Sequence, residues 1–201
     1  MKRSRRTIMA APMVRGFVVA GGQSSRMGQD KARLPYRETT LLEHAIVCAG
    51  EVTSDVRILC GPARRYEDAG VPVVQDAICG AGPISGLYSA LLSASVDGQD
   101  RIFWLAVDLP LVPPAFVMSL VRGLDRADVV MAGTERGPEP LCAAFQTEPT
   151  LAAVRRALFE GRLKLTSALD GLLIHTIAGD AATFANINTL GDYDHLGHPQ
   201  A

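Results

Sequence analysis

The sequence predicts an α/β fold in which a doubly wound, mostly parallel sheet is flanked by helices. Three observations support this prediction. Short apolar runs, typical of buried strands, alternate along the chain with longer segments of helical periodicity. The apolar content of 48% and the charged content of 20% are ordinary for a globular protein and argue against disorder. With 201 residues, the chain is long enough for one domain with a substantial core.

The predicted elements follow one another in a regular order. Strands are expected at residues 16–20, 56–60, 71–75, 102–107, 128–132, 141–145 and 172–177. Helices are expected at residues 41–51, 84–95, 114–126 and 150–160. Pro114 suits the first turn of its helix, because a missing N–H group there leaves no helical hydrogen bond unmade. Residues 1–14 are predicted to be a disordered basic leader, and residues 15–198 a single domain.

Charge and hydropathy exclude several classes of function. The formal net charge is −1, so no general basic field attracts nucleic acid. No apolar run approaches the roughly 20 residues of a membrane span. The cysteines are spread along the chain without a CxxC pair, which is typical of reduced thiols in a cytoplasmic protein. The expected partner is therefore a small anion that is held by local cations.

The most informative segment is residues 16–36, GFVVAGGQSSRMGQDKARLPY. An apolar strand runs directly into a glycine-rich loop, which is followed by the cations Arg26 and Lys31. Glycines let backbone N–H groups approach a polyphosphate, and Arg and Lys neutralise its charge. The residue order is neither that of a P-loop nor that of the dinucleotide fingerprint. This signature segment predicts nucleotide binding, and a glycine-rich turn with two surface cations is the simpler alternative.

Two aspartates follow other predicted strands and point to the same edge of the sheet. Asp108 directly follows the apolar residues IFWLAV, and Leu-Pro comes after it. A carboxylate in that position is a suitable ligand for Mg²⁺. It could instead cap the turn before Pro110. Asp76 precedes the GPISG sequence of residues 82–86, where a helix N-terminus can present N–H donors to an anion or a base edge. Asp76 could accept a hydrogen bond from a purine or a ribose, or cap a turn.

The signature segment resembles that of the sugar-nucleotide and cofactor nucleotidyltransferases, and is most similar to that of the molybdenum cofactor guanylyltransferases. The resemblance includes Asp108, the Gly-Pro sequence and the Asn-x-Asn-Thr sequence of residues 186–189. It implies a Rossmann-like fold of the nucleotide-diphospho-sugar transferase type. It also implies a Mg²⁺-dependent enzyme that transfers GMP from GTP to the phosphate of molybdopterin carrying molybdenum. The products would be molybdopterin guanine dinucleotide and pyrophosphate.

The resemblance further implies roles for individual residues. The implied catalytic residues are Lys31, Arg26 and Asp108, with Asp108 as the ligand of the Mg²⁺ cofactor. The implied nucleotide-binding residues are Val19, Ala20, Gly21, Gly22, Lys31, Asp76 and Asp108. Asn186 and Asn188 would share one strand face and contact the pterin or complete the metal–phosphate shell, or else serve in a turn or cap.

One departure from the family pattern concerns the nucleotide base. The family often has an asparagine near the end of the second strand, where this chain has Cys60 and Gly61. Backbone groups of these residues could replace it, but the base preference becomes uncertain.

Three alternatives stay open. A molybdopterin cytidylyltransferase would use the same fold with CTP, although the Ala20-Gly21-Gly22 sequence and the Gly-Pro sequence favour guanine. Another nucleotidyltransferase could act on a different small phosphorylated acceptor. A noncatalytic GTP-binding or cofactor-binding protein would not require all of the charged residues Arg26, Lys31 and Asp108, which are present here. The expected partners are GTP and molybdopterin, with no nucleic acid and no membrane. Transient contacts with other cofactor biosynthesis proteins or with molybdoenzymes are possible.

Overall fold

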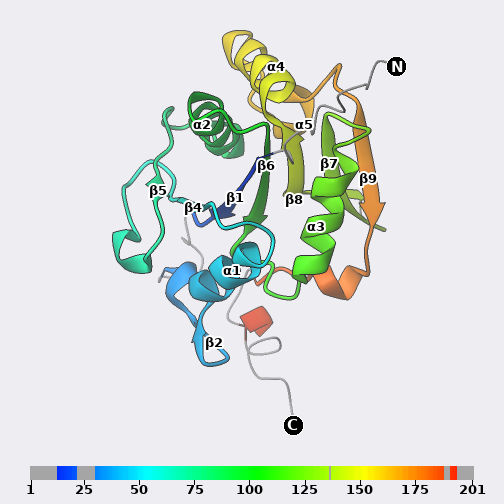
Figure 1. The fold of residues 1–201 in the computed structure, drawn as a ribbon. Helices are drawn as coiled ribbons and strands as arrows, with labels where there is room; N and C mark the ends of the chain where they lie inside the picture. Colours follow the sequence, from blue (N-terminus) through cyan, green and yellow to red (C-terminus); the bar gives the residue numbers. More distant parts are fainter. Residues whose placement is uncertain (1–12, 22–29, 136, 188–190, 194–201) are drawn as a thin grey trace, which may run out of the picture.

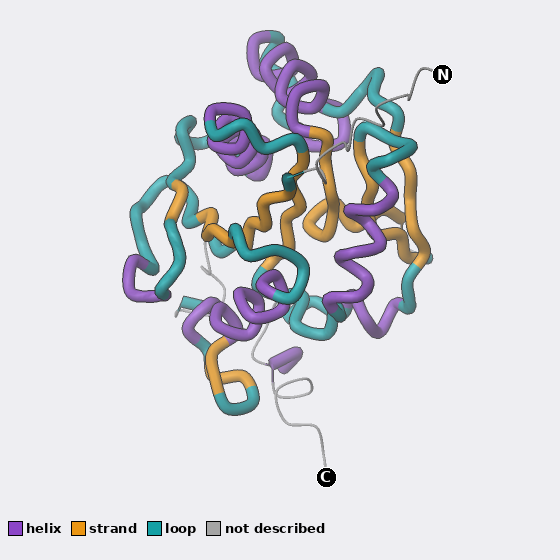
Figure 2. Tube along the Cα trace, viewed as in Figure 1, coloured by secondary structure: helices purple, strands orange, loops and turns teal. Residues whose placement is uncertain are grey.

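The computed structural model describes residues 13–21, 30–135, 137–187 and 191–193. A seven-stranded sheet of order β5-β4-β1-β6-β8-β7-β9 forms its centre (Figures 1 and 2). The strands are β1 (Val14–Val19), β4 (Val56–Leu59), β5 (Val73–Val74), β6 (Arg101–Ala106), β7 (Val129–Thr134), β8 (Gly137–Gln146) and β9 (Ile174–Ala178). The helices are α1 (Leu41–Gly50), α2 (Pro83–Val96), α3 (Pro114–Gly123), α4 (Thr147–Phe159) and α5 (Leu165–Ala168). A small hairpin joins β2 (Pro35–Tyr36) and β3 (Thr39–Thr40).

The direction of the strands confirms the predicted fold class. Strand β8 is antiparallel to β6 and β7, and the other pairs in the sheet are parallel. The chain passes from β1 through β4 to β5 and then returns to β6 on the other side of β1. This reversal creates a topological switch point at the carboxyl end of β1, which is where doubly wound sheets bind ligands.

Helices cover both faces of the sheet, so the core has two parts. Because side chains alternate along a strand, Val18 of β1 faces α1 and α3, whereas Phe17 faces α2 and α4. Phe103 and Trp104 of β6 divide between the two faces in the same way. All four side chains are at most 1% exposed. This double burial explains the nearly continuous apolar runs of the central strands.

Local sequence signals determine where several helices begin. The Thr40 hydroxyl accepts a hydrogen bond from the Glu43 N–H, and the Glu43 carboxylate accepts one from the Thr40 N–H, which forms a capping box at the start of α1. Pro114 is the first residue of α3, as predicted. Pro83 likewise opens α2, and the preceding Gly82 has a φ of +68°. The GPISG sequence therefore forms the beginning of α2.

The amino end of β1 is held by a network of ion pairs. The Arg15 side chain is 2% exposed, and its guanidinium group lies 2.8 Å from Asp55 and 2.9 Å from Asp97. It also donates to the Ser93 carbonyl oxygen at 3.0 Å. Arg57 of β4 contacts the same two aspartates. These bonds tie β1 and β4 to the C-terminal end of α2.

Some elements differ from the sequence-based prediction. Strand β8 begins at Gly137 rather than at residue 141, because residues 137–139 pair with β7 beyond a register shift between Met131 and Ala132. Strand β5 has two residues where five were predicted. The β2–β3 hairpin and α5 are too short to produce a periodic pattern. Strand β1 starts at Val14, inside the predicted leader, and residues 1–12 lie outside the described residues.

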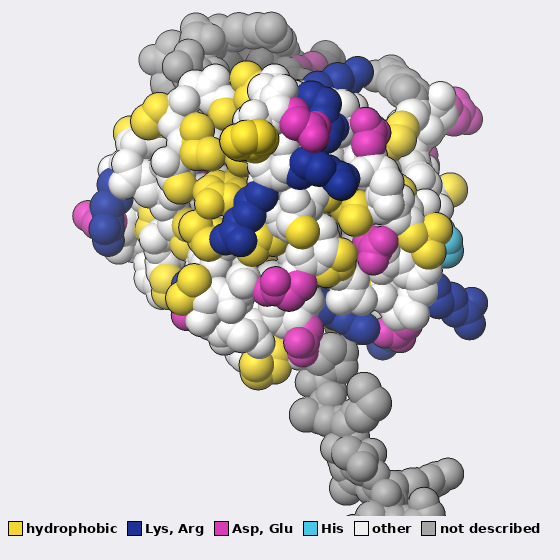
Figure 3. All heavy atoms as spheres, turned by 90° about the horizontal axis from the view of Figure 1, so that it is seen from above, with side chains coloured by type: hydrophobic (Ala, Val, Ile, Leu, Met, Phe, Trp, Pro, Cys, Tyr) yellow, Lys and Arg dark blue, Asp and Glu magenta, His cyan; other side chains and the backbone are white. Residues whose placement is uncertain are grey.

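Two other expectations concern the charge of the surface and the prediction of no membrane span. Figure 3 shows the face seen from above, where Lys and Arg side chains lie beside Asp and Glu side chains, in keeping with the net charge of −1. Among the described residues, no helix is long and apolar enough to cross a membrane.

Candidate active site

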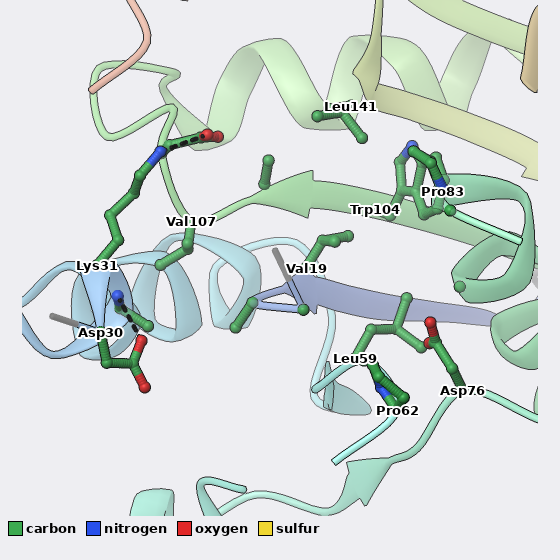
Figure 4. Close-up of a pocket in the computed structure, with 18 of the residues that line it drawn as sticks. Val19, Asp30, Lys31, Leu59, Pro62, Asp76, Pro83, Trp104, Val107 and Leu141 are labelled. Carbon is green, nitrogen blue, oxygen red and sulfur yellow. Dashed lines mark hydrogen bonds and ion pairs between the residues drawn. The ribbon is translucent and has the colours of Figure 1, made fainter. Parts of the chain in front are cut away.

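A cavity of about 500 Å³ lies at the carboxyl ends of β1, β4 and β6 (Figure 4). It is lined by six of the residues that the sequence assigned to a nucleotide site, namely Val19, Ala20, Gly21, Lys31, Asp76 and Asp108. The structure thus brings the carboxyl ends of three strands together with Lys31, which follows the glycine-rich loop of the signature segment. The other predicted residues Gly22, Arg26 and Asn188 lie outside the described part of the chain.

The floor of the cavity is a close contact between two glycines. A Cβ atom on Gly21 would lie 2.6 Å from the Gly61 nitrogen, and a Cβ atom on Gly61 would lie 2.9 Å from the Gly21 oxygen. Gly61 also has a φ of +75°, a conformation that side chains disfavour. Its carbonyl oxygen accepts a hydrogen bond from the Asp76 N–H at 2.9 Å. Gly61 therefore joins β1, β4 and the segment carrying Asp76.

An ion pair between Lys31 and Asp108 marks one end of the cavity (Figure 4). Lys31 begins a 3₁₀ turn, Lys31–Arg33, which is capped by the Asp30 carboxylate accepting from the Ala32 N–H at 3.1 Å. The Lys31 Nζ atom lies 3.0 Å from Oδ2 of Asp108. The other oxygen of Asp108, Oδ1, is buried and has no hydrogen-bond partner within the described residues. A buried carboxylate oxygen without a partner is suited to a ligand that supplies positive charge or a donor.

Asp76 lies at the opposite end of the cavity, near Pro62 and Pro83 (Figure 4). Burial raises the pKa of its carboxyl group above the usual range, and a hydrogen bond with the Ser85 side chain partly opposes this shift. Gly86, in the first turn of α2, stands next to it, because a Cβ atom there would lie 3.6 Å from Oδ1 of Asp76. The beginning of α2 therefore forms the wall beside Asp76.

The sequence analysis did not recognise the apolar wall of the cavity. Its side chains were assigned to buried strands or to no role, and they include Leu59, Ile78, Trp104 and Leu141. The Trp104 ring is 1% exposed, and its Nε1 atom donates to the Pro140 oxygen at 2.6 Å. A cavity with an ion pair at one end, a single carboxyl group at the other and an apolar wall suits an elongated ligand with a charged part and a flat part.

Glu139 is a further residue that the sequence analysis missed. It lies at the beginning of β8, and burial raises the pKa of its carboxyl group, with a further contribution from the charge of Asp108. Hydrogen bonds from the Leu141 N–H and the Asn186 side chain act in the opposite direction. The neighbouring Ile187 N–H donates to the Asp108 carbonyl oxygen at 3.1 Å. Asn186 thus lies beside the Asp108 end of the cavity, although it does not line the cavity itself.

The fold and the cavity together define a nucleotidyltransferase. A strand that ends in glycines meets a paired lysine and aspartate at the switch point of a doubly wound sheet, beside a cavity with an apolar wall. The sequence profile of the MobA-like NTP transferase domain matches residues 16–172, and the chain belongs to this family. It is therefore an enzyme of the nucleotidyltransferase class.

Individual relatives agree with this assignment. The chain is 30% identical over 180 residues to the probable molybdenum cofactor guanylyltransferase of Mycobacterium marinum, covering 88% of this chain and 90% of the relative. Among solved structures, the molybdopterin-guanine dinucleotide biosynthesis protein A of Archaeoglobus fulgidus superposes with a TM-score of 0.69 at 22% identity, covering 91% and 96% of the two chains. A Mycobacterium tuberculosis protein in complex with manganese superposes with a TM-score of 0.65 at 18% identity, covering 94% and 99%. At these identities the two superpositions show the fold.

Proposed function

We propose that this protein transfers GMP from GTP to the terminal phosphate of molybdopterin carrying molybdenum. The products would be molybdopterin guanine dinucleotide and pyrophosphate. The observation that supports this most is the cavity in which Lys31 and Asp108 pair beside the glycine-rich end of β1. The names of the curated relatives supply the guanine nucleotide and the acceptor.

The two ends of the cavity suggest how GTP is placed. The backbone of Val19, Ala20 and Gly21 would contact the nucleotide, with the base on the apolar wall and Asp76 accepting a hydrogen bond from the base or the ribose. The phosphates would lie toward Lys31, where a cation is in position. Arg26 and Gly22, from the same signature segment, are assigned to the phosphate side.

The donor set of the site fits a divalent cation. Asp108 has one carboxylate oxygen in an ion pair with Lys31 and a second, buried oxygen without a hydrogen bond among the described residues. Mg²⁺ commonly takes one or two carboxylates and completes its shell with phosphate oxygens and water. Asp108 would hold the ion, and a neighbour of the same fold was solved with manganese. A bound Mg²⁺ would neutralise negative charge on the phosphate oxygens.

The chemistry requires positioning and charge more than proton transfer. A terminal phosphate oxygen of molybdopterin attacks the α-phosphorus of GTP, a new P–O bond forms, and the bond to the β-phosphate oxygen breaks. This nucleophile is already ionised, so no general base is needed. Lys31 would stabilise the charge that develops as pyrophosphate leaves. Asn186, which lies beside the Asp108 end of the cavity, is a proposed contact for the acceptor or the metal–phosphate shell. Asn188, outside the described residues, is proposed for the same role from the sequence.

The choice of base is the least constrained part of this proposal. Cys60 and Gly61 lie in the region where the family often has an asparagine, and the Gly61 carbonyl oxygen already accepts a hydrogen bond from the Asp76 N–H. The Cys60 carbonyl oxygen accepts from Arg65 at 3.4 Å. The carbonyl oxygens of both residues therefore take part in the fold, and cytidylyl transfer is the second candidate.

Pyrophosphate release would test the proposal. Purified protein is incubated with Mg²⁺ and molybdenum-loaded molybdopterin, and release is compared between GTP and CTP. Release with GTP supports guanylyl transfer. Release mainly with CTP would overturn the base and keep the mechanism. No release with either nucleotide would indicate a different phosphorylated acceptor or a noncatalytic nucleotide-binding role.

The cytoplasmic location of the protein and its contact with molybdoenzymes stay predictions.

A further inference from the structure

The hydroxyl group of Tyr66 contacts residues on both sides of the glycine-rich loop in the signature segment. Tyr66 lies in the loop after β4, far from this segment in the sequence. Its oxygen is 2.8 and 2.9 Å from the two carboxylate oxygens of Asp30 and 3.3 Å from the Ala20 carbonyl oxygen. Ala20 follows β1, and Asp30 immediately precedes Lys31. One side chain from outside the segment therefore bridges residues on both sides of its glycine-rich loop.

The chemistry of these groups determines the direction of the hydrogen bonds. A phenol has one O–H donor, whereas the Asp30 carboxylate and the Ala20 carbonyl can only accept. The shorter distances assign the proton to Asp30. Burial raises the pKa of Tyr66 far above its usual range, and the Asp30 carboxylate adds to this shift. Both effects favour the protonated hydroxyl group, in agreement with its role as the donor to Asp30.

The surroundings hold Tyr66 firmly in this position. The residue is 4% exposed, and the guanidinium groups of Arg65 and Arg33 lie over its ring at 5.2 and 5.3 Å from the centroid. Its backbone has a φ of +67°, which is unfavourable for a bulky side chain. Arg65 also lies 3.7 Å from Asp30 and offsets part of its negative charge. An uncommon backbone conformation is retained where it delivers the hydroxyl group to Asp30.

Asp30 connects Tyr66 to the site. It caps the turn that begins with Lys31, and the Lys31 ammonium group reaches Asp108. We propose that Tyr66 is a positioning residue of the nucleotide site, which acts through Asp30 to fix where Lys31 presents its charge. This inference rests on the proposed function, because it assumes that Lys31 binds the nucleotide phosphates.

A double-mutant cycle would test this role. Tyr66→Phe keeps the ring between the two arginines and removes only the O–H group. We expect about tenfold weaker binding of GTP with Mg²⁺, measured by calorimetry without acceptor, since hydrogen bonds to charged groups are worth about this much. In a Lys31→Ala background, Tyr66→Phe should change GTP affinity by less than about twofold, because coupled residues are not additive. An equal loss in both backgrounds would overturn the proposal.

Controls separate this effect from a general loss of stability. Tyr88→Phe removes a hydroxyl group from α2, away from the cavity lining, and should leave GTP affinity unchanged. Thermal unfolding sets the temperature at which all variants are folded. If the unsubstituted protein binds CTP instead of GTP, the guanine assignment fails, and the same cycle with CTP still decides the role of Tyr66. If it binds neither nucleotide, the proposed function and this inference are both overturned.

Discussion

Charged side chains gather at both ends of β1, and the two groups differ in how fully they satisfy one another. At the amino end, Arg15 and Arg57 each contact Asp55 and Asp97 at 2.8 to 3.5 Å. At the carboxyl end, the Lys31–Asp108 pair leaves one buried carboxylate oxygen of Asp108 without a hydrogen bond among the described residues. The first group is complete within the fold, and the second leaves a carboxylate oxygen available to a ligand.

The pKa values of three carboxyl groups differ between the two ends in the same way. A hydrogen bond from Arg15 lowers the pKa of Asp97. At the other end, burial raises the pKa of Asp76 and of Glu139. The fold therefore favours the ionised form of Asp97 at the amino end and disfavours the ionised forms of Asp76 in the cavity and Glu139 near Asp108. Charges that are disfavoured in the free protein are typical of functional sites. Substitutions at each end of β1 can test this difference.

The largest expected effect is that of Asp108→Asn. We expect pyrophosphate release to fall by about a thousandfold, because the variant loses the proposed metal ligand and the charge opposite Lys31. Thermal unfolding should show an intact fold. The matched variant Asp97→Asn, at the amino end, should keep its activity at temperatures where it is folded. Full activity of Asp108→Asn would contradict the proposed metal site.

Arg15→Leu should have the opposite effect, namely a loss of stability without a loss of GTP affinity. Removing this buried guanidinium group leaves Asp55 and Asp97 with less compensation, and the free energy of unfolding should fall by about 3 kcal/mol. Denaturant-induced unfolding would measure it. Arg57→Leu should cost less, since the Arg57 side chain is 23% exposed against 2% for Arg15. GTP affinity should be unchanged in both, and weaker binding by folded Arg15→Leu would show that the two ends are coupled.

A comparison of two glycines would sharpen the account of the cavity floor. Gly61 and Gly70 both have a φ of +75°, but a Cβ atom would have neighbours within 4 Å at Gly61 and none among the described residues at Gly70. Gly70→Ala should therefore cost about 1 kcal/mol for the backbone conformation alone. Gly61→Ala should cost about 2 kcal/mol more, because it also displaces Gly21, and should weaken GTP binding. Equal losses of stability would show that the contact between the glycines is easily relieved.

The smallest expected effect is that of Asp76→Asn. Because folding raises the pKa of Asp76, its ionised form destabilises the free protein at neutral pH, and the variant should gain less than about 1 kcal/mol. The gain should disappear as the pH falls below the carboxyl pKa of the unfolded chain, where Asp76 is protonated in both states. The contribution of Asp97 has the opposite sign, since it is present at neutral pH and lost on acidification. GTP binding by Asp76→Asn should weaken; a destabilised variant at neutral pH would contradict this account.

Short-range patterns in the sequence, such as apolar runs and the residues that end them, predicted much of the fold. Apolar runs that end in Gly21, Asp76 and Asp108 located three strand ends, and parallel strands place such ends at one edge. The role of Tyr66 could not be predicted, because nothing in its neighbourhood indicates that it contacts Asp30. Glu139 was missed for a related reason. Its proximity to Asp108 follows from the antiparallel pairing of β6 with β8, which the sequence does not reveal.

The direction of β8 has a consequence for which part of the chain supplies the Asp108 end of the site. Since β8 is antiparallel to β6, it begins at the edge of the sheet where β6 ends. Glu139, near the start of β8, is therefore close enough to Asp108 for the charge of Asp108 to raise the pKa of its carboxyl group. A strand that comes late in the chain thus brings a carboxyl group to the end of the site that Lys31 and Asp108 form.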